Sequence, residues 1–333
     1  MANFLTKKIE NKVLMLVPSV FNYSNNLEKS LSKICDDYIC LNERPSNAFF
    51  IKAGLRINFS PLSFILTYSY YNHIFKKIIE SFVDTVLIIN PEATPAWFVK
   101  KLRKKKIKII FYLWDSIKNK PQNKKIIPFA NHVWSFDNID CQEYKLSYKP
   151  LFYSTENNIE YSSEQYDLSF IGTLHGDRYE VVNNIFGMLN NKKTFKFFYC
   201  PSKILFFFNK FISKKWAHIN ISDVSFDALD YSQVEKIMNN SSVILDIHSS
   251  GKNGLTMRTI ETLGKGKKIL TTNNNIKTAP FYDEKFIMCF DRKKIEDINI
   301  NRLNEFLSVK EHLNLNIKKQ HIDHWLRSLF IFN

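Results

Sequence analysis

The chain is predicted to be an α/β protein built on two parallel sheets, and three features of the sequence support this. Short runs rich in Val, Ile, Leu and Phe recur along most of the chain, and helical patterns separate them. The runs are apolar throughout, which is typical of strands buried on both faces of a parallel sheet. They form two series, joined near residues 145–165, so two Rossmann-like domains are expected.

In the first series, a helix is expected to begin in the Asn- and Ser-rich segment 22–26. Another is expected after 91–95, because proline suits the first turn of a helix. The strands predicted for this series are 12–18, 38–41, 84–90, 107–114 and 132–136.

In the second series, a helix is expected to follow a polar loop at 172–178, and the stretch 292–328 has a helical apolar stripe. The predicted domains are 1–150 and 151–310, with a terminal helix over 311–333 that packs back on the first domain. The strands predicted for this series are 166–171, 195–199, 243–247, 268–272 and 287–290.

The 333-residue chain is 45% hydrophobic, enough to build two cores, and carries a net charge of +15. This charge suits nucleic acid, an anionic membrane surface or phosphorylated substrates, and equally a lysine-rich surface without a specific partner. Basic residues are concentrated in the block 100–108. The stretch 203–216 mixes lysines with phenylalanines and Trp216.

The five cysteines show no C-x-x-C spacing, which predicts reduced, mostly buried thiols in a cytoplasmic protein. Residues 1–12 contain no apolar core of a signal peptide, and no apolar run approaches the roughly 18 residues of a spanning helix. Peripheral attachment to the inner face of the membrane, through 100–108 and 203–216, is a further hypothesis.

Signatures of other protein classes are absent from the sequence. A dehydrogenase requires G-x-G-x-x-G after an early strand, but the first strand is followed by a segment without glycine, 18–22. A P-loop is absent too. There is no recognised nucleic-acid-binding module, so no specific nucleic-acid partner is expected. No D-x-D motif stands in a metal-binding setting, and neither a metal nor another cofactor is expected.

Glycine is concentrated in the second domain, where seven of the eight glycines lie between residues 172 and 266. Open α/β sheets bind ligands beyond the carboxyl ends of their strands, at helix N-termini. The loops 172–178 and 248–254 both meet this condition for a diphosphate. Gly172, Thr173 and Arg178 are the candidates in the first loop. Ordinary turns that use glycine for their geometry are the alternative.

The window 241–273 predicts a strand–loop–helix–strand unit with Arg258 and Glu261 close to one face of its helix. A guanidinium grips phosphate oxygens in a bidentate manner, and a carboxylate accepts hydrogen bonds from ribose hydroxyls. An exposed Arg–Glu pair without a ligand is the alternative. The threonines of the helix and its bracketing by Gly254 and Gly264 favour the site.

The sequence G-L-T-M-R-T-I-E-T-L-G-K-G-K-K-I-L-T-T-N at 254–273 resembles the donor-binding signature of GT-B glycosyltransferases. It is most similar to bacterial surface-polysaccharide and spore-maturation-type glycosyltransferase-like proteins with G-L-T-x-R-x-x-E. The resemblance is specific over about 165–290 and architectural over 1–150. It implies a GT-B fold, two Rossmann-like domains that face a cleft, followed by C-terminal helices.

The resemblance also implies roles for residues. Glu261 corresponds to the glutamate that binds ribose, and Arg258 faces the diphosphate together with the backbone of Gly254, Leu255 and Thr256. A large retaining family has a second glutamate eight residues before the first, where this chain has Asn253. A retaining outcome is therefore not implied.

The function implied is a glycosyltransferase that moves a sugar from a nucleotide-sugar donor to a saccharide or lipid-linked acceptor. Its context would be the synthesis of capsule, lipopolysaccharide or another bacterial surface polysaccharide. The donor would bind the second domain and the acceptor the first, and arginine and helix N-termini would stabilise the leaving diphosphate without a metal. A nucleotide-sugar epimerase and a non-catalytic GT-B protein are the alternatives, and a basic nucleic-acid-binding protein is a less favoured one.

An inverting enzyme also needs a base that takes the proton of the acceptor hydroxyl. Asp115, Glu92 and Asp137 stand at strand ends of the first domain, and Asp115 is preferred because it ends the run FYLWD. An N-cap role is the alternative for Asp115. His248, directly after its strand, is the second catalytic candidate, with a structural histidine as the alternative.

Overall fold

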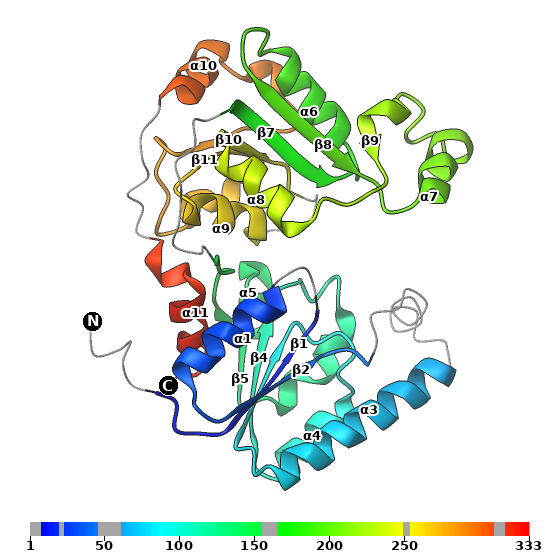
Figure 1. Ribbon diagram of the computed structural model, residues 1–333, viewed down its shortest axis with the longest axis vertical. Helices are drawn as coiled ribbons and strands as arrows, with labels where there is room; N and C mark the ends of the chain where they lie inside the picture. Colours follow the sequence, from blue (N-terminus) through cyan, green and yellow to red (C-terminus); the bar gives the residue numbers. More distant parts are fainter. Residues whose placement is uncertain are drawn as a thin grey trace. The chain divides into compact units, whose positions relative to one another are not determined.

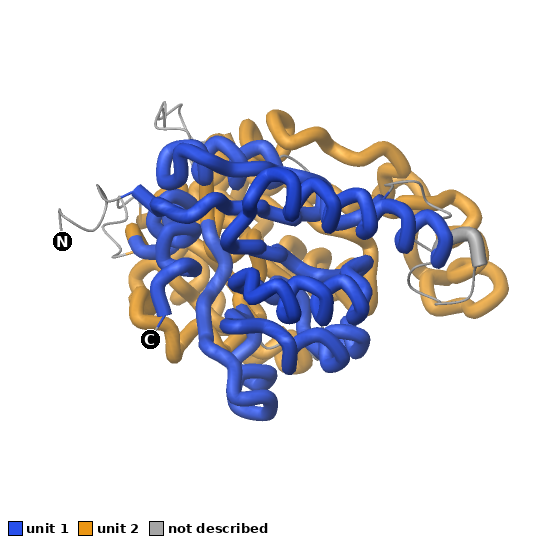
Figure 2. The backbone as a smooth tube through the Cα atoms, turned by 90° about the horizontal axis from the view of Figure 1, so that it is seen from below, with its two compact units in different colours: residues 1–152, 319–333 blue, residues 153–318 orange. Residues whose placement is uncertain are grey.

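The structure is a computed structural model that describes residues 8–19, 23–45, 61–154, 165–248, 254–309 and 317–332. The chain divides into two compact units, which Figure 2 distinguishes by colour. Unit 1 comprises Met1–Phe152 and Lys319–Asn333, and unit 2 comprises Tyr153–Lys318. The carboxyl-terminal segment therefore belongs to the same unit as the amino-terminal half.

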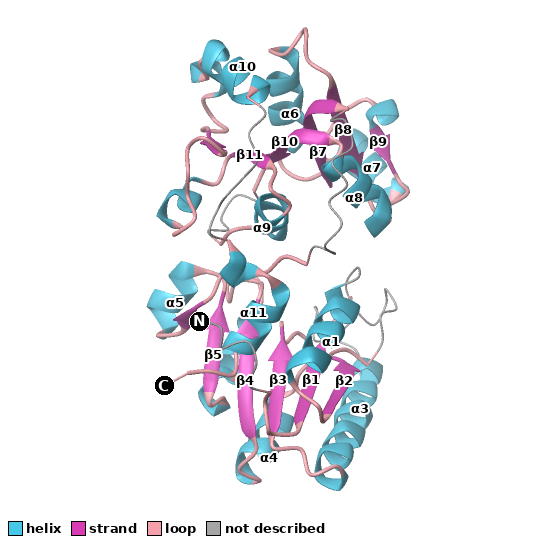
Figure 3. Ribbon diagram, turned by 60° about the vertical axis from the view of Figure 1, so that its left-hand side comes forward, coloured by secondary structure: helices cyan, strands magenta, loops and turns pink. Residues whose placement is uncertain are grey.

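Unit 1 contains a six-stranded parallel sheet with the order β2-β1-β3-β4-β5-β6. Figure 3 shows the longer strands running in one direction. Each strand predicted for the first series is confirmed to within one residue, and β6 adds a short edge strand. The strands are β1 (Val13–Val17), β2 (Tyr38–Asn42), β3 (Thr85–Ile89), β4 (Lys108–Leu113), β5 (His132–Ser135) and β6 (Ser147–Tyr148).

Helices cover both faces of this sheet (Figure 1). Alternate residues of β4 face opposite ways, as a pleated strand requires. Phe111 and Leu113 belong to the core that α3 and α4 cover, whereas the ring of Tyr112 lies 4.6 Å from that of Trp325 in α11. The helices are α1 (Tyr23–Ile34), α3 (Pro61–Glu80), α4 (Ala96–Lys104), η2 (Pro121–Lys125), η3 (Ile127–Phe129), α5 (Asn138–Tyr144), η8 (Lys318–Gln320) and α11 (Ile322–Ser328).

Unit 2 repeats this architecture with the strand order β12-β11-β10-β7-β8-β9. Its pairs are also parallel. The strands predicted for the second series are confirmed to within two residues, and β9 adds an edge strand. The strands are β7 (Tyr166–Thr173), β8 (Thr194–Tyr199), β9 (Val224–Ser225), β10 (Ser241–Asp246), β11 (Lys268–Thr271) and β12 (Ile287–Cys289).

The helices of unit 2 enclose a core to which Val182 of α6, Phe206 of α7 and Leu307 of α10 contribute. Among the described residues of both units, no helix is both long and apolar enough to cross a bilayer. The helices are α6 (Arg178–Gly187), α7 (Lys203–Phe207), η4 (Phe208–Ile212), η5 (Ile221–Asp223), α8 (Tyr231–Asn239), α9 (Met257–Gly264), η6 (Asn274–Thr278), η7 (Ile295–Asp297) and α10 (Ile300–Ser308).

One expectation about local structure is wrong. Gly172 and Thr173 lie not in a loop but in the last part of β7, where they pair with β8. The stretch 292–328 contains two separate α-helices, because α10 ends at an extended Val309 and α11 belongs to the other unit. The apolar stripe of that stretch thus comes from helices that serve two separate cores.

In each unit the strand order reverses beside one strand of the sheet. β1 lies between β2 and β3, and β7 lies between β8 and β10. Such a reversal creates a topological switch point, where open α/β sheets bind ligands. Since the strands are parallel, their carboxyl ends meet at one edge in each unit, and functional side chains are expected there.

Candidate functional site

Asp246, at the carboxyl end of β10, ties together the strand–loop–helix–strand unit of unit 2. Its buried carboxylate accepts hydrogen bonds from the hydroxyls of Thr256 (3.2 Å), Thr259 (2.9 Å) and Thr271 (3.3 Å). These threonines belong to the cap of α9, to α9 itself and to β11. One carboxylate therefore fixes the start of α9 to the ends of two neighbouring strands.

The backbone that leads into α9 is held from both sides. Thr256 is the N-cap, and its hydroxyl accepts a hydrogen bond from the Thr259 N–H at 3.1 Å. The buried side-chain amide of Asn273 donates to the carbonyl of Gly254 at 3.1 Å. The first N–H groups of a helix lack intrahelical acceptors and carry the positive end of its dipole. Residues 254–256 thus form a fixed segment at an edge that favours anions.

Arg258 and Glu261 follow on α9, and both are half-buried. The guanidinium of Arg258 lies against α8, where its Nη1 is 2.8 Å from Sδ of Met238. Glu261 lies one turn further along the helix. Nucleotide binding by these two side chains stays a prediction.

Two arginines link the loops around the switch point of unit 2. Arg178, the first residue of α6, donates to main-chain carbonyls after β10 (3.0 Å) and at the end of β7 (3.1 Å). Arg292, which follows β12, donates to the carbonyl of His248 at 2.8 Å and pairs with Asp177 through two hydrogen bonds. The guanidinium groups thus gather where the carboxyl ends of β7 and β10 meet.

His248 is fixed beside these arginines by Thr272. Its Nδ1 lies 2.7 Å from the Thr272 hydroxyl, and its backbone N–H donates to the same oxygen at 3.2 Å. Burial lowers the pKa of the imidazole; Asp246 opposes this shift and Arg178 reinforces it. The ring is therefore mainly neutral at neutral pH and acts as a hydrogen-bonding group rather than a cation.

Gly172 has a packing role in β7. A Cβ atom at this position would lie 2.6 Å from Cζ of Phe170, so any larger residue would displace that ring. Gly176 instead supplies a left-handed backbone, with φ of 61°, in the turn before α6. The turn geometry of this loop therefore depends on Gly176 and not on Gly172.

Asp246, Asn273 and Arg292 are not among the site residues predicted from the sequence. Each stands at, or within three residues of, the carboxyl end of a strand. A polar residue that closes an apolar run is the signal by which they are found. Asn253, with the rest of 249–253, lies outside the described residues.

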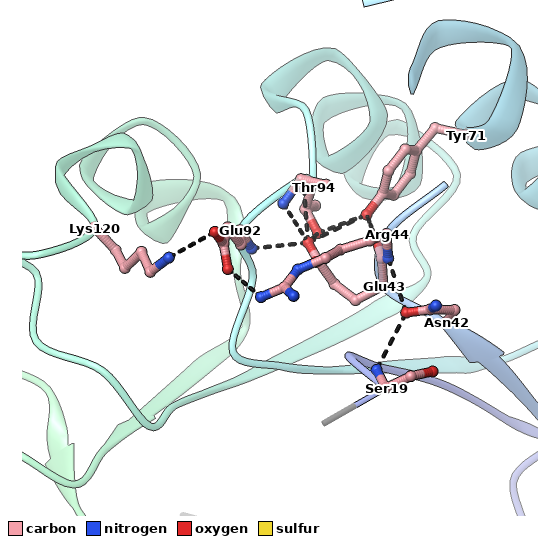
Figure 4. Close-up of polar contacts among 9 residues, drawn as sticks. Ser19, Asn42, Glu43, Arg44, Tyr71, Glu92, Thr94 and Lys120 are labelled. Atoms are coloured by element: carbon pink, nitrogen blue, oxygen red, sulfur yellow. Dashed lines mark hydrogen bonds and ion pairs between the residues drawn. The ribbon is translucent and has the colours of Figure 1, made fainter. Parts of the chain in front are cut away.

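At the corresponding edge of unit 1, Glu43 is completely buried directly after β2 (Figure 4). Its Oε1 accepts hydrogen bonds from three successive backbone N–H groups, those of residues 92–94, at 2.7–2.8 Å. The Thr94 hydroxyl donates to the same oxygen at 2.9 Å, and the Tyr71 hydroxyl donates to the Glu43 carbonyl at 2.6 Å. Glu43 therefore shapes the turn between β3 and α4.

Glu92, on that turn, is enclosed by two cations (Figure 4). Its Oε2 pairs with Arg44, and its Oε1 lies 2.8 Å from Nζ of Lys120. The three side chains are between 5% and 11% exposed, so solvent screens their attraction little. Removal of Glu92 would leave two buried cations without the carboxylate that both of them contact.

Glu43 itself titrates near neutrality. Burial raises its pKa from 4.5 to about 7, although the hydrogen bonds to its carboxylate and Arg44 oppose the shift. Its other oxygen, Oε2, is buried and has no partner among the described residues. A proton on Oε2 thus removes the buried charge and leaves the hydrogen bonds to Oε1 in place. The only sequence signal for Glu43 is its charge directly after a strand.

The two other candidate bases of unit 1 have structural hydrogen bonds. Asp115 accepts from the Ser116 N–H (3.0 Å) and from the side-chain amide of Asn119 (2.8 Å), which holds the turn after β4. Asp137 caps α5 and accepts from the Ile139 N–H at 2.9 Å. Among the described residues, no three His, Cys, Asp or Glu side chains group as a metal site.

No protein-family model matches the sequence, and no curated protein matches it. Solved structures match along almost the whole chain. The UDP-GlcNAc 2-epimerase from Methanocaldococcus jannaschii has a TM-score of 0.57 at 12% identity, over 96% of this chain and 98% of that one. The fold is GT-B. It consists of two parallel six-stranded sheets with helices, as in GT-B glycosyltransferases and UDP-GlcNAc 2-epimerases.

Two glycosyltransferase structures show the same GT-B likeness. Sucrose-phosphate synthase from Thermosynechococcus elongatus has a TM-score of 0.58 at 8% identity, over 96% of this chain and 94% of that one. The lipopolysaccharide outer core galactosyltransferase WaaB has a TM-score of 0.52 at 13% identity, over 96% of this chain and 99% of that one. At such identities the likeness establishes the GT-B fold alone. The predicted GT-B architecture is confirmed, and the narrower resemblance to spore-maturation-type proteins stays a prediction.

Proposed function

We propose that this GT-B protein is a glycosyltransferase that moves a sugar from a nucleotide-sugar donor to a saccharide or lipid-linked acceptor. The process would be the synthesis of a bacterial surface polysaccharide, in the cytoplasm at the inner face of the membrane. The observation that carries the proposal is the anchored start of α9, where Asp246 and Asn273 hold residues 254–256. A backbone fixed at a helix N-terminus suits the diphosphate of a nucleotide sugar.

The nucleotide class is supported by a structure of similar fold. The Methanocaldococcus jannaschii epimerase is also known in complex with UDP-GlcNAc and UDP, with a TM-score of 0.52 to this chain. In the proposal, the backbone of 254–256 binds the diphosphate, and Arg258 and Arg178 supply positive charge. Glu261 binds the ribose. Such an arrangement stabilises the leaving diphosphate without a metal or another cofactor, so activity should survive EDTA.

The acceptor is proposed to bind at the carboxyl edge of unit 1, with Asp115 as the base. His248 is proposed to contact the phosphate or the sugar of the donor. Asp115→Asn should then lower kcat without changing the affinity for nucleotide. His248→Ala should weaken donor binding instead. Equal kcat values for Asp115→Asn and wild type would show that Asp115 is not the base.

A thermal-shift screen with nucleotide diphosphates and nucleotide sugars tests the donor site, because a ligand that binds the folded state stabilises it. The nucleotide that stabilises the wild type should stabilise Arg258→Ala and Glu261→Ala less. Arg302→Ala and Glu305→Ala are matched controls, since these residues have the same spacing on α10 and are exposed. An unchanged response in both folded site variants would contradict the assignment.

A nucleotide-sugar epimerase is the second candidate, since UDP-GlcNAc 2-epimerases are among the similar folds. Product analysis separates the two activities. A transferase should release nucleotide diphosphate and form a glycosylated product only when an acceptor is present. Conversion of the donor to its epimer without an acceptor would instead establish the epimerase.

A further inference from the structure

An apolar surface of unit 2 faces solvent between β8 and β9. Here α7 continues directly into the π-helical turn η4, and Figure 1 shows α7 at the margin of the unit, beside β9. Ile204, Phe211 and Ile212 are 65–83% exposed. This surface is called the α7–η4 surface and comprises Ile204, Leu205, Phe207, Phe208, Phe211 and Ile212.

The α7–η4 surface is exposed although its segment is firmly anchored. Phe206 and Trp216 are buried with their ring centroids 5.9 Å apart, and Phe206 also lies 5.7 Å from Phe226. The ammonium group of Lys210 donates to two carbonyls of the following loop, at 3.0 and 2.6 Å. The core therefore holds one face of the segment and presents the other to solvent.

The α7–η4 surface is also concentrated and preformed. Seven of the 18 large apolar side chains exposed in the described part of the chain lie between residues 204 and 221. Single exposed apolar residues are normal, whereas a contiguous group marks an interaction site. Phe207 and Phe211, one helical turn apart, stack with their ring centroids at 5.9 Å and their planes at 10°.

The positive charge around the α7–η4 surface indicates which kind of partner it fits. Between residues 201 and 222 the sequence has four lysines and no aspartate or glutamate. Lys203, Lys214 and Lys215 are exposed beside the apolar side chains. Aromatic and aliphatic side chains rimmed by lysines suit the interface of a bilayer with anionic headgroups. A second copy of the chain would bring like charges together, which opposes symmetric self-association through this surface.

We propose that the α7–η4 surface is a membrane anchor, which inserts its apolar side chains into the interface of an anionic bilayer. This inference rests on the surface alone and not on the transfer reaction. The basic block 100–108 differs, because its apolar residues Leu102 and Ile107 are buried. That block adds long-range attraction but no insertion.

Flotation of the full-length protein with phosphatidylcholine vesicles, with and without phosphatidylglycerol, tests the anchor. Phe208→Asn/Phe211→Asn should lower the partition coefficient by about tenfold or more, because two partly buried rings are lost from the interface. Phe82→Asn is the matched control, since Phe82 is 86% exposed in unit 1, and it should leave partition unchanged.

Charge substitutions sharpen the same test. Lys214→Gln/Lys215→Gln should weaken binding to the anionic vesicles by about fivefold per charge and leave binding to phosphatidylcholine unchanged. Lys104→Gln/Lys105→Gln, in the block without exposed apolar residues, should have a smaller effect. If the two double variants weakened binding to anionic vesicles equally, binding would depend on overall charge and not on insertion of the α7–η4 surface. That result would overturn the proposal.

Two further outcomes would also overturn the anchor. The first is equal flotation of the wild type and the phenylalanine variant. The second is a dimer in light scattering that the phenylalanine variant abolishes while the wild type does not float, which would assign the surface to a second copy. Circular dichroism and the nucleotide-induced thermal shift should match wild type in all variants. Failure of the anchor is thereby distinguished from failure of the donor site.

Discussion

The carboxyl edges of the two sheets share a topology but use their polar side chains differently. In unit 1, charged groups bond to each other, since Arg44 and Lys120 enclose Glu92. In unit 2, the polar groups bond to neutral partners, since the carboxylate of Asp246 accepts from threonine hydroxyls at the start of α9 and Asn273 binds the Gly254 carbonyl. The first edge contains buried ion pairs, and the second contains an ordered backbone segment, 254–256, at the start of a helix.

One sheet topology thus supports two different arrangements of polar groups. Buried charges are costly unless every partner is present, so the edge of unit 1 should tolerate substitution poorly and respond to pH. At the edge of unit 2, the buried carboxylate of Asp246 has hydroxyl groups as partners, and loss of one such partner costs less than loss of a buried charge, so this edge should lose binding geometry before it loses stability.

The largest expected effect is that of Glu43→Ala. It leaves three N–H groups and one hydroxyl without their acceptor, and each costs roughly 1–3 kcal/mol when buried. We expect unit 1 to lose about 4 kcal/mol of unfolding free energy. Urea unfolding followed by tryptophan fluorescence measures it, since four of the five tryptophans lie in unit 1. A loss below about 1 kcal/mol would mean that water replaces the carboxyl group.

The pH dependence of Glu43 comes next. The folded state keeps the proton up to about pH 7, whereas an ordinary glutamate releases it near 4.5. The folded state therefore binds more protons within this window, and stability should fall as pH rises through it, by roughly 1 kcal/mol per pH unit. Glu43→Gln mimics the protonated form and should gain stability relative to wild type over the same window. A difference that does not change with pH would contradict the raised pKa.

Asp246→Asn tests the edge of unit 2. The amide replaces one acceptor oxygen by a donor that faces threonine hydroxyls, so we expect a loss of about 2 kcal/mol in unit 2. Relative to wild type, the thermal shift produced by nucleotide should decrease by a larger fraction than the free energy of unfolding. Hydrogen exchange of peptides from β10 and α9 reports the loosening. Asp227→Asn, at an exposed position of the same unit, should change neither quantity. Unchanged nucleotide binding in Asp246→Asn would show that the hydrogen bonds of Asp246 are not needed for the proposed donor site.

The smallest expected changes in stability are those of substitutions at two threonines of α9. Both are completely buried, but the Thr259 hydroxyl donates to Asp246, whereas the Thr262 hydroxyl has no partner among the described residues. Thr259→Val should destabilise unit 2 by about 1 kcal/mol, and Thr262→Val should be neutral or stabilising. Denaturant unfolding of the two variants side by side gives the contrast. Equal losses would show that shape, and not the hydrogen bond, matters at Thr259.

Patterns that are local in sequence predicted much of the fold and part of the candidate site. Ten strands were found from continuous apolar runs, and Thr256, Arg258 and Glu261 were placed on one short helix. The helix α3 was not predicted, and neither were the edge strands β6 and β9. The edge strands are two residues long, too short to show a period.

Local sequence patterns alone indicated that two parallel sheets form and that a short helix follows the eighth apolar run, 243–247, because both signals depend on neighbours in the chain. Only the tertiary structure decided the partners of Glu43, whose acceptor oxygen meets an N–H 49 residues away. It also placed Arg258 against Met238, 20 residues earlier in the chain. The physical reason is strand order: it brings distant loops to one edge, and no local periodicity encodes which loops will meet.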